Sequence, residues 1–244
     1  MAQIIAHRGS SGNRPENTLP AFAEAIRVDV DVIELDVHLS KDQQLIVMHD
    51  ESVNRTTNGR GFIHEKTLAE IKKLSVVSRF REYHATKVPT LKEVLDLLVM
   101  RNFRGVLLIE IKTDQVSYPG IETILARELN RQKWPFNYWY CSFNLVTLAN
   151  IHTLEPRIPL ALVSQSLQLE LLRVVPSYIE GIHLNKNWLL KQPPFVSQTN
   201  FSIRSWTVNT QEEAEQLLRL GVKGLITDYP EKMRQIENSY RRGK

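Results

Sequence analysis

Side chains that could carry out acid–base or metal chemistry interrupt four otherwise apolar segments of this sequence. The segments are IIAHR, VIELDV, LIVMHD and LLIEIK, and each contains residues that a buried core does not favour. Parallel strands covered on both faces are normally continuous runs of Val, Ile and Leu, so polar exceptions toward their carboxyl ends indicate function. The exceptions are His7, Arg8, Glu34, Asp36, His49, Asp50, Glu110 and Lys112.

Three of these side chains are carboxylates that would meet if the strand ends converge at one mouth: Glu34, Asp36 and Glu110. Three negative charges within a few ångströms repel one another by several kcal/mol at intermediate dielectric, unless protons or a cation neutralise them. Oxygen ligands without cysteine favour a hard cation such as Mg²⁺, Ca²⁺ or Mn²⁺ over zinc. The sequence therefore predicts a divalent metal site, most simply for Mg²⁺ or Ca²⁺.

The remaining residues of the set predict what would bind beside such a metal. Arg8 and Lys112 are both positively charged. The guanidinium of Arg8 offers several N–H donors and the ammonium of Lys112 a compact positive charge, and this combination suits a phosphate group. Histidine is the side chain that titrates near neutral pH, so His7 and His49 could act as general base and general acid across a phosphorus atom. A phosphate ester is the predicted substrate.

Three further polar residues lie near the predicted mouth. His38 follows Asp36 by two positions and shares its strand face, where we expect the imidazole to face solvent. Asn209 and Asp228 lie at the ends of late strands, where hydrogen bonding within the scaffold and contact with a ligand are equally consistent with the pattern.

The elements that position these residues alternate between short β-rich runs and amphipathic helices, which favours a parallel sheet wrapped by helices. Three helices are expected to open with Thr followed three residues later by Glu, the capping-box pattern, and Gly221 should end the last of them. Thr18 should cap an earlier helix. The nine expected strands lie within 3–8, 31–40, 44–50, 105–112, 138–143, 158–164, 181–185, 201–209 and 224–229.

The fold that this order predicts is a TIM-like (β/α)8 barrel. With 244 residues and 42% hydrophobic content, residues 1–244 should form a single catalytic domain. Residues 55–88 contain no convincing strand, so we interpret them as a small insertion after the third strand, over one end of the barrel.

Nine strands are one more than the eight positions of the barrel, and a hairpin near the start of the chain explains the extra strand. Only the polar residues KDQQ separate the second and third expected strands, and a link that short makes an antiparallel hairpin. A turn centred on Asp42 and Gln43 would pair residues whose numbers sum to 85. His49 would then face Asp36 across the hairpin.

Composition narrows the class of protein. The 31 basic residues exceed the 27 acidic ones by four, without the basic clusters interleaved with aromatics that nucleic-acid binders carry. A single cysteine, Cys141, excludes an intramolecular disulfide and is expected to be a buried thiol. No signal-like N-terminus and no apolar run of about 20 residues is present, so we expect a cytoplasmic protein without stable membrane insertion.

Several motifs together resemble the glycerophosphodiester phosphodiesterase family, in order and across almost the whole chain. They are HRG, PENT and AF near the N-terminus, then IELDVHLSKD, VMHD, RTTNGRG, PTLKEVL, IEIK, SF, SWTVN and GLITDYP. The resemblance implies a TIM-like barrel that uses a divalent metal to hydrolyse a glycerophosphodiester to glycerol 3-phosphate and an alcohol.

By position, the resemblance also implies roles for single residues. The family's acid–base pair corresponds to His7 and His49, its metal ligands to Glu34, Asp36 and Glu110, and its phosphate contacts to Arg8 and Lys112. Glu16 and Asn17 of PENT match residues that line the metal and substrate site, and Trp206 of SWTVN matches an aromatic that packs against the glycerol end.

The chain departs from the family's pattern at two turns, and two other functions stay open. Asp29, Val30 and Asp31 replace the usual Gly-Ala-Asp before the second strand, and Gln43 replaces the glycine common in the hairpin turn. The alternatives are a phosphodiesterase of the same barrel type directed at lysophospholipids or phosphoinositides, and a non-catalytic binder of phosphate ligands.

Overall fold

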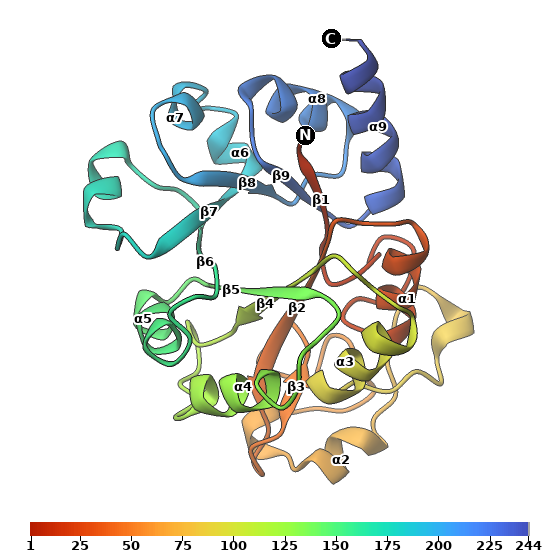
Figure 1. Cartoon of the computed structure of the whole chain (residues 1–244). Helices are drawn as coiled ribbons and strands as arrows, with labels where there is room; N and C mark the ends of the chain where they lie inside the picture. Colours follow the sequence, from red (N-terminus) through yellow and green to blue (C-terminus); the bar gives the residue numbers. More distant parts are fainter. Residues whose placement is uncertain (244) are drawn as a thin grey trace.

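All nine strands belong to one sheet, which closes on itself. In the computed structural model, which describes residues 1–243, the strand order is β1-β9-β8-β7-β6-β5-β4-β2-β3, and β1 also pairs with β2. Only β3 runs antiparallel, on β2, so eight parallel strands close the barrel (Figure 1). The strands are β1 Gln3–Ala6, β2 Val32–Leu39, β3 Leu45–Val47, β4 Val106–Ile111, β5 Asn137–Ser142, β6 Leu160–Ser164, β7 Ile179–Asn185, β8 Ser202–Trp206 and β9 Gly224–Thr227.

Helices surround the barrel, and their ends follow the expected capping patterns. Thr67, Thr90 and Thr210 each form a complete capping box, and Gly221 ends its helix in the left-handed conformation, with φ of 84°. The α-helices are α1 Leu19–Arg27, α2 Leu68–Lys73, α3 Leu91–Met100, α4 Ile121–Leu129, α5 Leu145–Leu154, α6 Lys186–Leu189, α7 Pro194–Ser197, α8 Gln211–Leu220 and α9 Pro230–Arg242. Three 3₁₀ turns complete the elements: η1 Ile63–Glu65, η2 Arg81–Tyr83 and η3 Leu169–Val174.

Successive residues of the barrel strands alternate between the barrel interior and the layer under the helices. On β4, Leu107 and Ile109 pack in the large core, whereas Leu108 joins the smaller cluster that fills the barrel interior. Because side chains two apart share a face of a strand, Glu110 continues the face that begins with Leu108. The same alternation places Glu34 and Asp36 on the face of the interior residue Val32.

The hairpin of β2 and β3 forms as expected, but the predicted register is wrong by one residue. Leu39 pairs with Leu45 and Val37 with Val47, so the residue numbers sum to 84 rather than 85. The reason is the loop between Leu39 and Leu45, which has an odd number of residues, with Gln43 at φ of 59°, where the predicted turn had an even number. His49 therefore does not face Asp36 across the ladder; the N–H of Met48 donates to the Asp36 carbonyl oxygen at 3.2 Å instead.

The segment 55–88 contains no strand and one α-helix, as the sequence predicts. Its apolar side chains form a small core of their own beneath α2, together with residues of the hairpin. Ile63, Ile71 and Val76 belong to this core and are almost fully buried. One isolated bridge, Ser52–Phe62, ties the segment to the residues before it, and another, Thr57–Val76, joins two parts of the segment itself.

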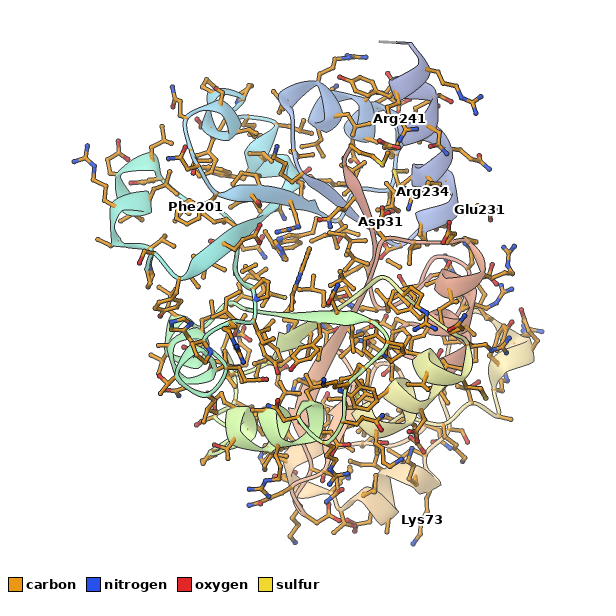
Figure 2. The ribbon with its side chains drawn as sticks, viewed as in Figure 1. Asp31, Lys73, Phe201, Glu231, Arg234 and Arg241 are labelled. Carbon is orange, nitrogen blue, oxygen red and sulfur yellow. The ribbon has the colours of Figure 1, made fainter. Side chains whose placement is uncertain are left out.

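The two turns that depart from the family's pattern both contain a residue in the left-handed region. Asp29 has φ of 54° and Gln43 φ of 59°, conformations that glycine adopts at least cost. Asp31 links two elements of the fold. Its carboxylate accepts from the N–H of Ile4 at 2.7 Å and from Arg234 of α9 at 2.8 Å (Figure 2), which ties the first barrel strand to the last helix.

Within residues 1–243, the helices are all too short or too polar to cross a membrane.

The left-handed turn predicts a stabilising substitution. We expect Gln43→Gly to raise the free energy of unfolding by about 0.5–1 kcal/mol, because relief of left-handed strain exceeds the entropy that glycine adds to the unfolded chain. Urea denaturation followed by circular dichroism measures the change. The neighbouring Gln44→Gly is the matched control and should destabilise. A loss of stability in Gln43→Gly would contradict the argument.

Candidate active site

A cavity of about 300 Å³ lies at the carboxyl ends of the barrel strands. Several of the residues that line it directly follow a strand, such as His7 after β1 and Phe143 after β5. The cavity therefore lies at the mouth of the barrel. Its floor is apolar. The lining consists of His7, Arg8, Glu34, His49, Leu108, Glu110, Cys141, Phe143, Val163, Gln165, His183, Trp206, Thr207 and Ile226.

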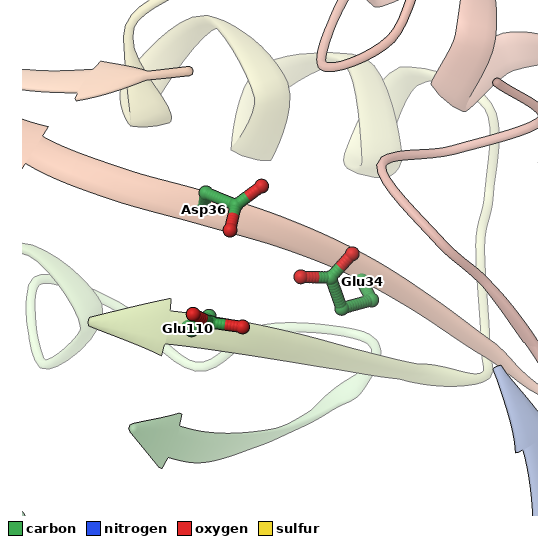
Figure 3. Close-up of side chains that lie close together, drawn as sticks. All are labelled: Glu34, Asp36 and Glu110. Atoms are coloured by element: carbon green, nitrogen blue, oxygen red, sulfur yellow. The ribbon is translucent and has the colours of Figure 1, made fainter. Parts of the chain in front are cut away.

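The three predicted metal ligands come together (Figure 3), and two of them, Glu34 and Glu110, line this cavity. Glu34 and Asp36 extend from the same face of β2, and Asp36 lies directly beside Glu110 in the pairing of β2 with β4. Ligand oxygens of the three carboxylates all lie within 4.8 Å of one another. Glu34 and Asp36 lie past the end of β1, which pairs with β2 only as far as Ile33.

The shared burial of these carboxylates perturbs their protonation. Desolvation, reinforced by repulsion from the neighbouring carboxylates, raises the pKa of Glu34 far above its usual value. Desolvation also raises the pKa of Glu110. Burial acts in the same sense on Asp36, but the attraction of Arg8 and Lys112 outweighs it and lowers the pKa of Asp36 to about 2.

The two predicted phosphate contacts are the cations that partly compensate this charge. The Lys112 ammonium donates to Glu110 at 2.7 Å and lies 3.8 Å from Asp36. Arg8 Nε lies 3.5 Å from Asp36 Oδ2, too long and misaligned for a hydrogen bond, and this buried nitrogen has no hydrogen-bond partner within residues 1–243. A buried guanidinium N–H without an acceptor at the edge of a cavity favours an anionic ligand.

Arg8 owes its direction to an unusual backbone conformation. Its φ of 56° lies in the left-handed region, and its N–H donates to the Glu34 carboxylate at 2.7 Å. Gly9 follows with φ of 78°, and a Cβ there would approach Ala21 to 2.7 Å. The chain therefore turns sharply at the end of β1, so that Arg8 bends back toward the carboxylates instead of continuing the strand.

Both predicted acid–base residues line the cavity, and each is held by an aspartate at its Nδ1. The Nδ1 of His7 lies 2.7 Å from Asp228, and the Nδ1 of His49 lies 2.7 Å from Asp50. An imidazole that donates from Nδ1 to a carboxylate keeps Nε2 for other partners when it is neutral. Each ring is thus oriented for proton transfer at Nε2.

Further contacts stabilise the two aspartates as anions. Burial acts to raise the pKa of Asp228, but the hydrogen bond from His7 and that from Asn209 outweigh it and lower this pKa to about 2. The hydrogen bonds from His49 and Arg55 lower the pKa of Asp50 below its usual range. These carboxylates can therefore hold their histidines across the neutral pH range.

Glu16 and Asn17 lie next to the site but behind the cavity wall. Arg55 bridges Glu16 and Asp50, with N–O distances of 2.7–2.9 Å, and Arg8 donates to Glu16 at 2.8 Å. The amide of Asn17 donates to Asp36 at 2.8 Å. Both residues thus orient charged side chains of the site; their contact with substrate stays a prediction.

Trp206 also lines the cavity. Its indole N–H donates to the His183 carbonyl at 3.0 Å, and its ring meets that of Phe143 edge to face, with centroids 6.0 Å apart. Together these rings form an apolar wall that could contact the carbon atoms of a small ligand.

His38 does not face solvent, so that prediction is wrong. Its side chain is fully buried, because the loop after β4 folds over this part of β2 and brings Tyr118 against it. Burial lowers the pKa of His38 to about 4. Nδ1 lies 3.0 Å from the Tyr118 hydroxyl, and Nε2 lies 3.1 Å from the carbonyl oxygen of His49.

The sequence left the partners of the two histidines unassigned. Asp50 follows His49 directly, so its position in the chain was a usable signal. Asp228 lies 221 residues from His7 in the chain, and only the closure of the barrel between β1 and β9 brings them together. Cys141 is a buried thiol, as expected.

A divalent metal ion fits the carboxylate cluster. Calcium binds oxygen ligands at about 2.3–2.6 Å and magnesium at about 2.0–2.1 Å, so two ligands of one ion lie at most about 4–5 Å apart. The ligand oxygens of Glu34, Asp36 and Glu110 lie within 4.8 Å of one another, in agreement with this range. An added positive charge would also relieve the repulsion that raises the pKa of Glu34.

Comparison with known proteins agrees with this geometry over nearly the whole chain. Residues 7–232 match the glycerophosphoryl diester phosphodiesterase family. A glycerophosphodiester phosphodiesterase of Caldanaerobacter subterraneus subsp. tengcongensis is 37% identical, over 93% of this chain and 94% of the relative. A glycerophosphodiester phosphodiesterase of Bacillus altitudinis is 36% identical, over 97% of this chain and 98% of the relative.

A solved structure with the same fold carries a ligand. A phosphodiesterase of Oleispira antarctica, in complex with the product sn-glycerol-3-phosphate, superposes with a TM-score of 0.87 and 28% identity, over 98% of this chain and 97% of that one. The match of sequence, the barrel and the arrangement of its mouth lead to one conclusion: this chain belongs to the glycerophosphoryl diester phosphodiesterase family of enzymes.

Proposed function

We propose that this enzyme hydrolyses glycerophosphodiesters to glycerol 3-phosphate and an alcohol, with the help of a divalent metal ion. The observation that carries the proposal is that His7 and His49, each held at Nδ1 by an aspartate, line one cavity with Glu34 and Glu110. The product bound to the Oleispira antarctica relative supports glycerol 3-phosphate as the product here. Residues 1–244 would act as one catalytic domain, with 55–88 as an insertion.

Glu34, Asp36 and Glu110 would hold the metal ion, as Mg²⁺ or Ca²⁺. When bound, such an ion would supply positive charge to the phosphate oxygens and make the phosphorus atom easier to attack. The chain's own residues contribute the rest of the binding. Lys112 stays charged, because the attraction of Glu110 and Asp36 outweighs its burial and raises its pKa.

Arg8 would bind the phosphate through its guanidinium. Its Nε has no partner of its own, while Glu16 holds Nη1 and thus fixes the plane of the group. An oxyanion at the edge of the cavity would satisfy the free N–H. Glu16 and Asn17 would act beside the substrate mainly by orienting Arg8 and Asp36, and Trp206 would pack against the glycerol carbons.

His7 and His49 would move the two protons of the reaction. One imidazole would accept a proton at Nε2 from the nucleophile, which is either water or a glycerol hydroxyl that forms a cyclic phosphate for water to open. The other would deliver a proton from Nε2 to the departing alcohol oxygen as its bond to phosphorus breaks. Asp228 and Asp50 would stabilise the imidazolium in each case, because each accepts from the opposite nitrogen at 2.7 Å. Both carboxylates would thus lower the barrier without touching the substrate.

A lysophospholipid substrate is the second candidate, and one observation favours it. Exposed apolar side chains lie at the start of α5 and in η3, the elements that follow β5 and β6, and the residues directly after those strands, Phe143 and Gln165, line the cavity. The exposed side chains are Leu145, Val146, Leu169, Leu171 and Val174. An acyl chain could lie on them. Since all predicted acid, base and metal positions are filled, we do not propose a non-catalytic binder.

The first prediction concerns the two histidines. We expect His7→Ala and His49→Ala to lower kcat by at least about 100-fold with the fold intact, because each removes one proton transfer. Incubation with glycerophosphoethanolamine and Mg²⁺, followed by an enzymatic assay of glycerol 3-phosphate, measures the rate. His152→Ala, which removes a histidine stacked on Tyr178 away from the cavity, is the control. A rate near that of the wild type in either catalytic variant would refute the acid–base assignment.

The second prediction concerns the metal. At a Mg²⁺ or Ca²⁺ concentration 100 times the dissociation constant, the wild type should gain about 2.7 kcal/mol of stability over the protein in chelator. Glu34→Gln should lose most of that gain while still accepting the N–H of Arg8. Thermal unfolding with and without metal measures both. Glu122→Gln is the control, because Glu122 is a buried glutamate that accepts a hydrogen bond from Asn150. This variant should gain as much stability from the metal as the wild type. An equal gain in Glu34→Gln would rule out this site.

The third prediction separates the two substrate classes. We expect glycerophosphocholine to be hydrolysed faster than lysophosphatidylcholine, because a cavity of about 300 Å³ matches the size of a small diester better than that of a lipid with a long acyl chain. Rates with both substrates, measured below the critical micelle concentration, test this. Should the lysolipid be faster, and should Val174→Glu slow only the lysolipid, the second candidate would replace the first.

A further inference from the structure

His49 lies beyond the regular part of the sheet. β3 ends at Val47, and the N–H of Met48 makes the last contact with β2, at 3.2 Å from the Asp36 carbonyl oxygen. The backbone at His49 therefore lacks the ladder that holds the other barrel residues of the site. Within residues 1–243, the carbonyl oxygen of His49 accepts one hydrogen bond, from the ring of His38 at 3.1 Å.

His38 reaches this carbonyl because of how β2 is built. The pairing of β2 with β4 stops at Val37 and Ile111, and β2 continues for two more residues. His38 shares the strand face of Asp36, yet it lies outside the cavity lining and is fully buried. Its imidazole thus fills the space between the end of the barrel and the loop that carries His49.

The hydrogen bonds define the state of the His38 ring. A carbonyl oxygen only accepts, so Nε2 of His38 carries the proton and donates to His49. In the neutral ring Nδ1 is then an acceptor, and the Tyr118 hydroxyl at 3.0 Å donates to it. The Tyr118 ring also packs edge-on against the imidazole, with centroids 5.5 Å apart and an angle of 69°. Tyr118 therefore leaves the imidazole no freedom to turn away.

We propose that His38 is a positioning residue for His49, and that Tyr118 holds His38 in place. The catalytic ring is then fixed at two points: Asp50 holds its Nδ1, and His38 holds its backbone. Loss of either would let Nε2 move relative to the phosphorus atom. Displacements of about 1 Å are known to cost enzymes about 100-fold in rate. The inference rests on the proposed function in one respect, since it requires His49 to be catalytic.

A double-mutant cycle tests the inference. We expect His38→Leu to lower kcat with glycerophosphoethanolamine by about 10–100-fold and to change KM by less than about 3-fold. In a His49→Ala background the same substitution should cost almost nothing, because the residue it positions is already gone. The residual rate is measured at high enzyme concentration through release of glycerol 3-phosphate. An equal loss in both backgrounds would show a general structural effect and overturn the inference.

Two further variants keep the test decisive if His38→Leu does not fold. His38→Gln retains an N–H donor at the position of Nε2 and should recover most of the rate. Tyr118→Phe removes only the hydroxyl and should lower kcat several-fold, whereas Tyr138→Phe, which deletes a hydroxyl bonded to Glu155, should leave kcat unchanged. A His38→Gln variant 100-fold slower than wild type, or a Tyr118→Phe variant as fast as Tyr138→Phe, would contradict the positioning role.

The outcomes for the two proposals differ. An inactive wild type would overturn the proposed function, and the role of His38 with it. An active wild type with a normal His38→Leu variant would overturn only the role of His38.

Discussion

The concentration of negative charge at the mouth of the barrel is the constraint on which the rest of the site depends. Glu34, Asp36 and Glu110 bring oxygens within 4.8 Å of one another in surroundings that exclude most water. Such a cluster is unfavourable unless positive charge compensates it. Arg8 and Lys112 compensate part of it, and a bound divalent cation would compensate the remainder. The same charge balance that makes the protein tolerate the cluster is the basis on which we propose that a metal ion and a phosphate bind there.

Much of the surrounding structure holds these charges in place rather than touching a ligand. Asn17 donates to Asp36, Glu16 fixes Arg8, and Arg55 joins Glu16 to Asp50. The left-handed backbone at Arg8, closed by the Glu34 carboxylate, belongs to the same network. The apolar floor and the pair of aromatic rings then complete a cavity in which one side is charged and the other is not. This asymmetry suits a ligand with a phosphate at one end and carbon atoms at the other.

The two histidines illustrate how an active site uses both local and distant contacts. His49 has a partner beside it in the chain, Asp50, whereas His7 depends on Asp228 from the last barrel strand. His49 in turn lies past the end of a short strand, so a buried side chain on the neighbouring strand takes over the support of its backbone. The positions of both imidazoles thus depend on contacts between segments, and for His7 barrel closure is what creates the contact.

Local patterns in the sequence were enough to predict the nine strands, the capped helices and the set of charged residues at the strand ends, because periodicity, caps and turn residues act over a few neighbouring positions. They also led to the correct barrel, since alternation of element types limits the possible topologies. The hairpin register was predicted wrongly because nothing local reveals that Gln43 adopts φ of 59°. The burial of His38 and the pairing of His7 with Asp228 were decided only by the tertiary structure, since their partners lie 80 and 221 residues away, and contacts at that separation exist only once the barrel has closed.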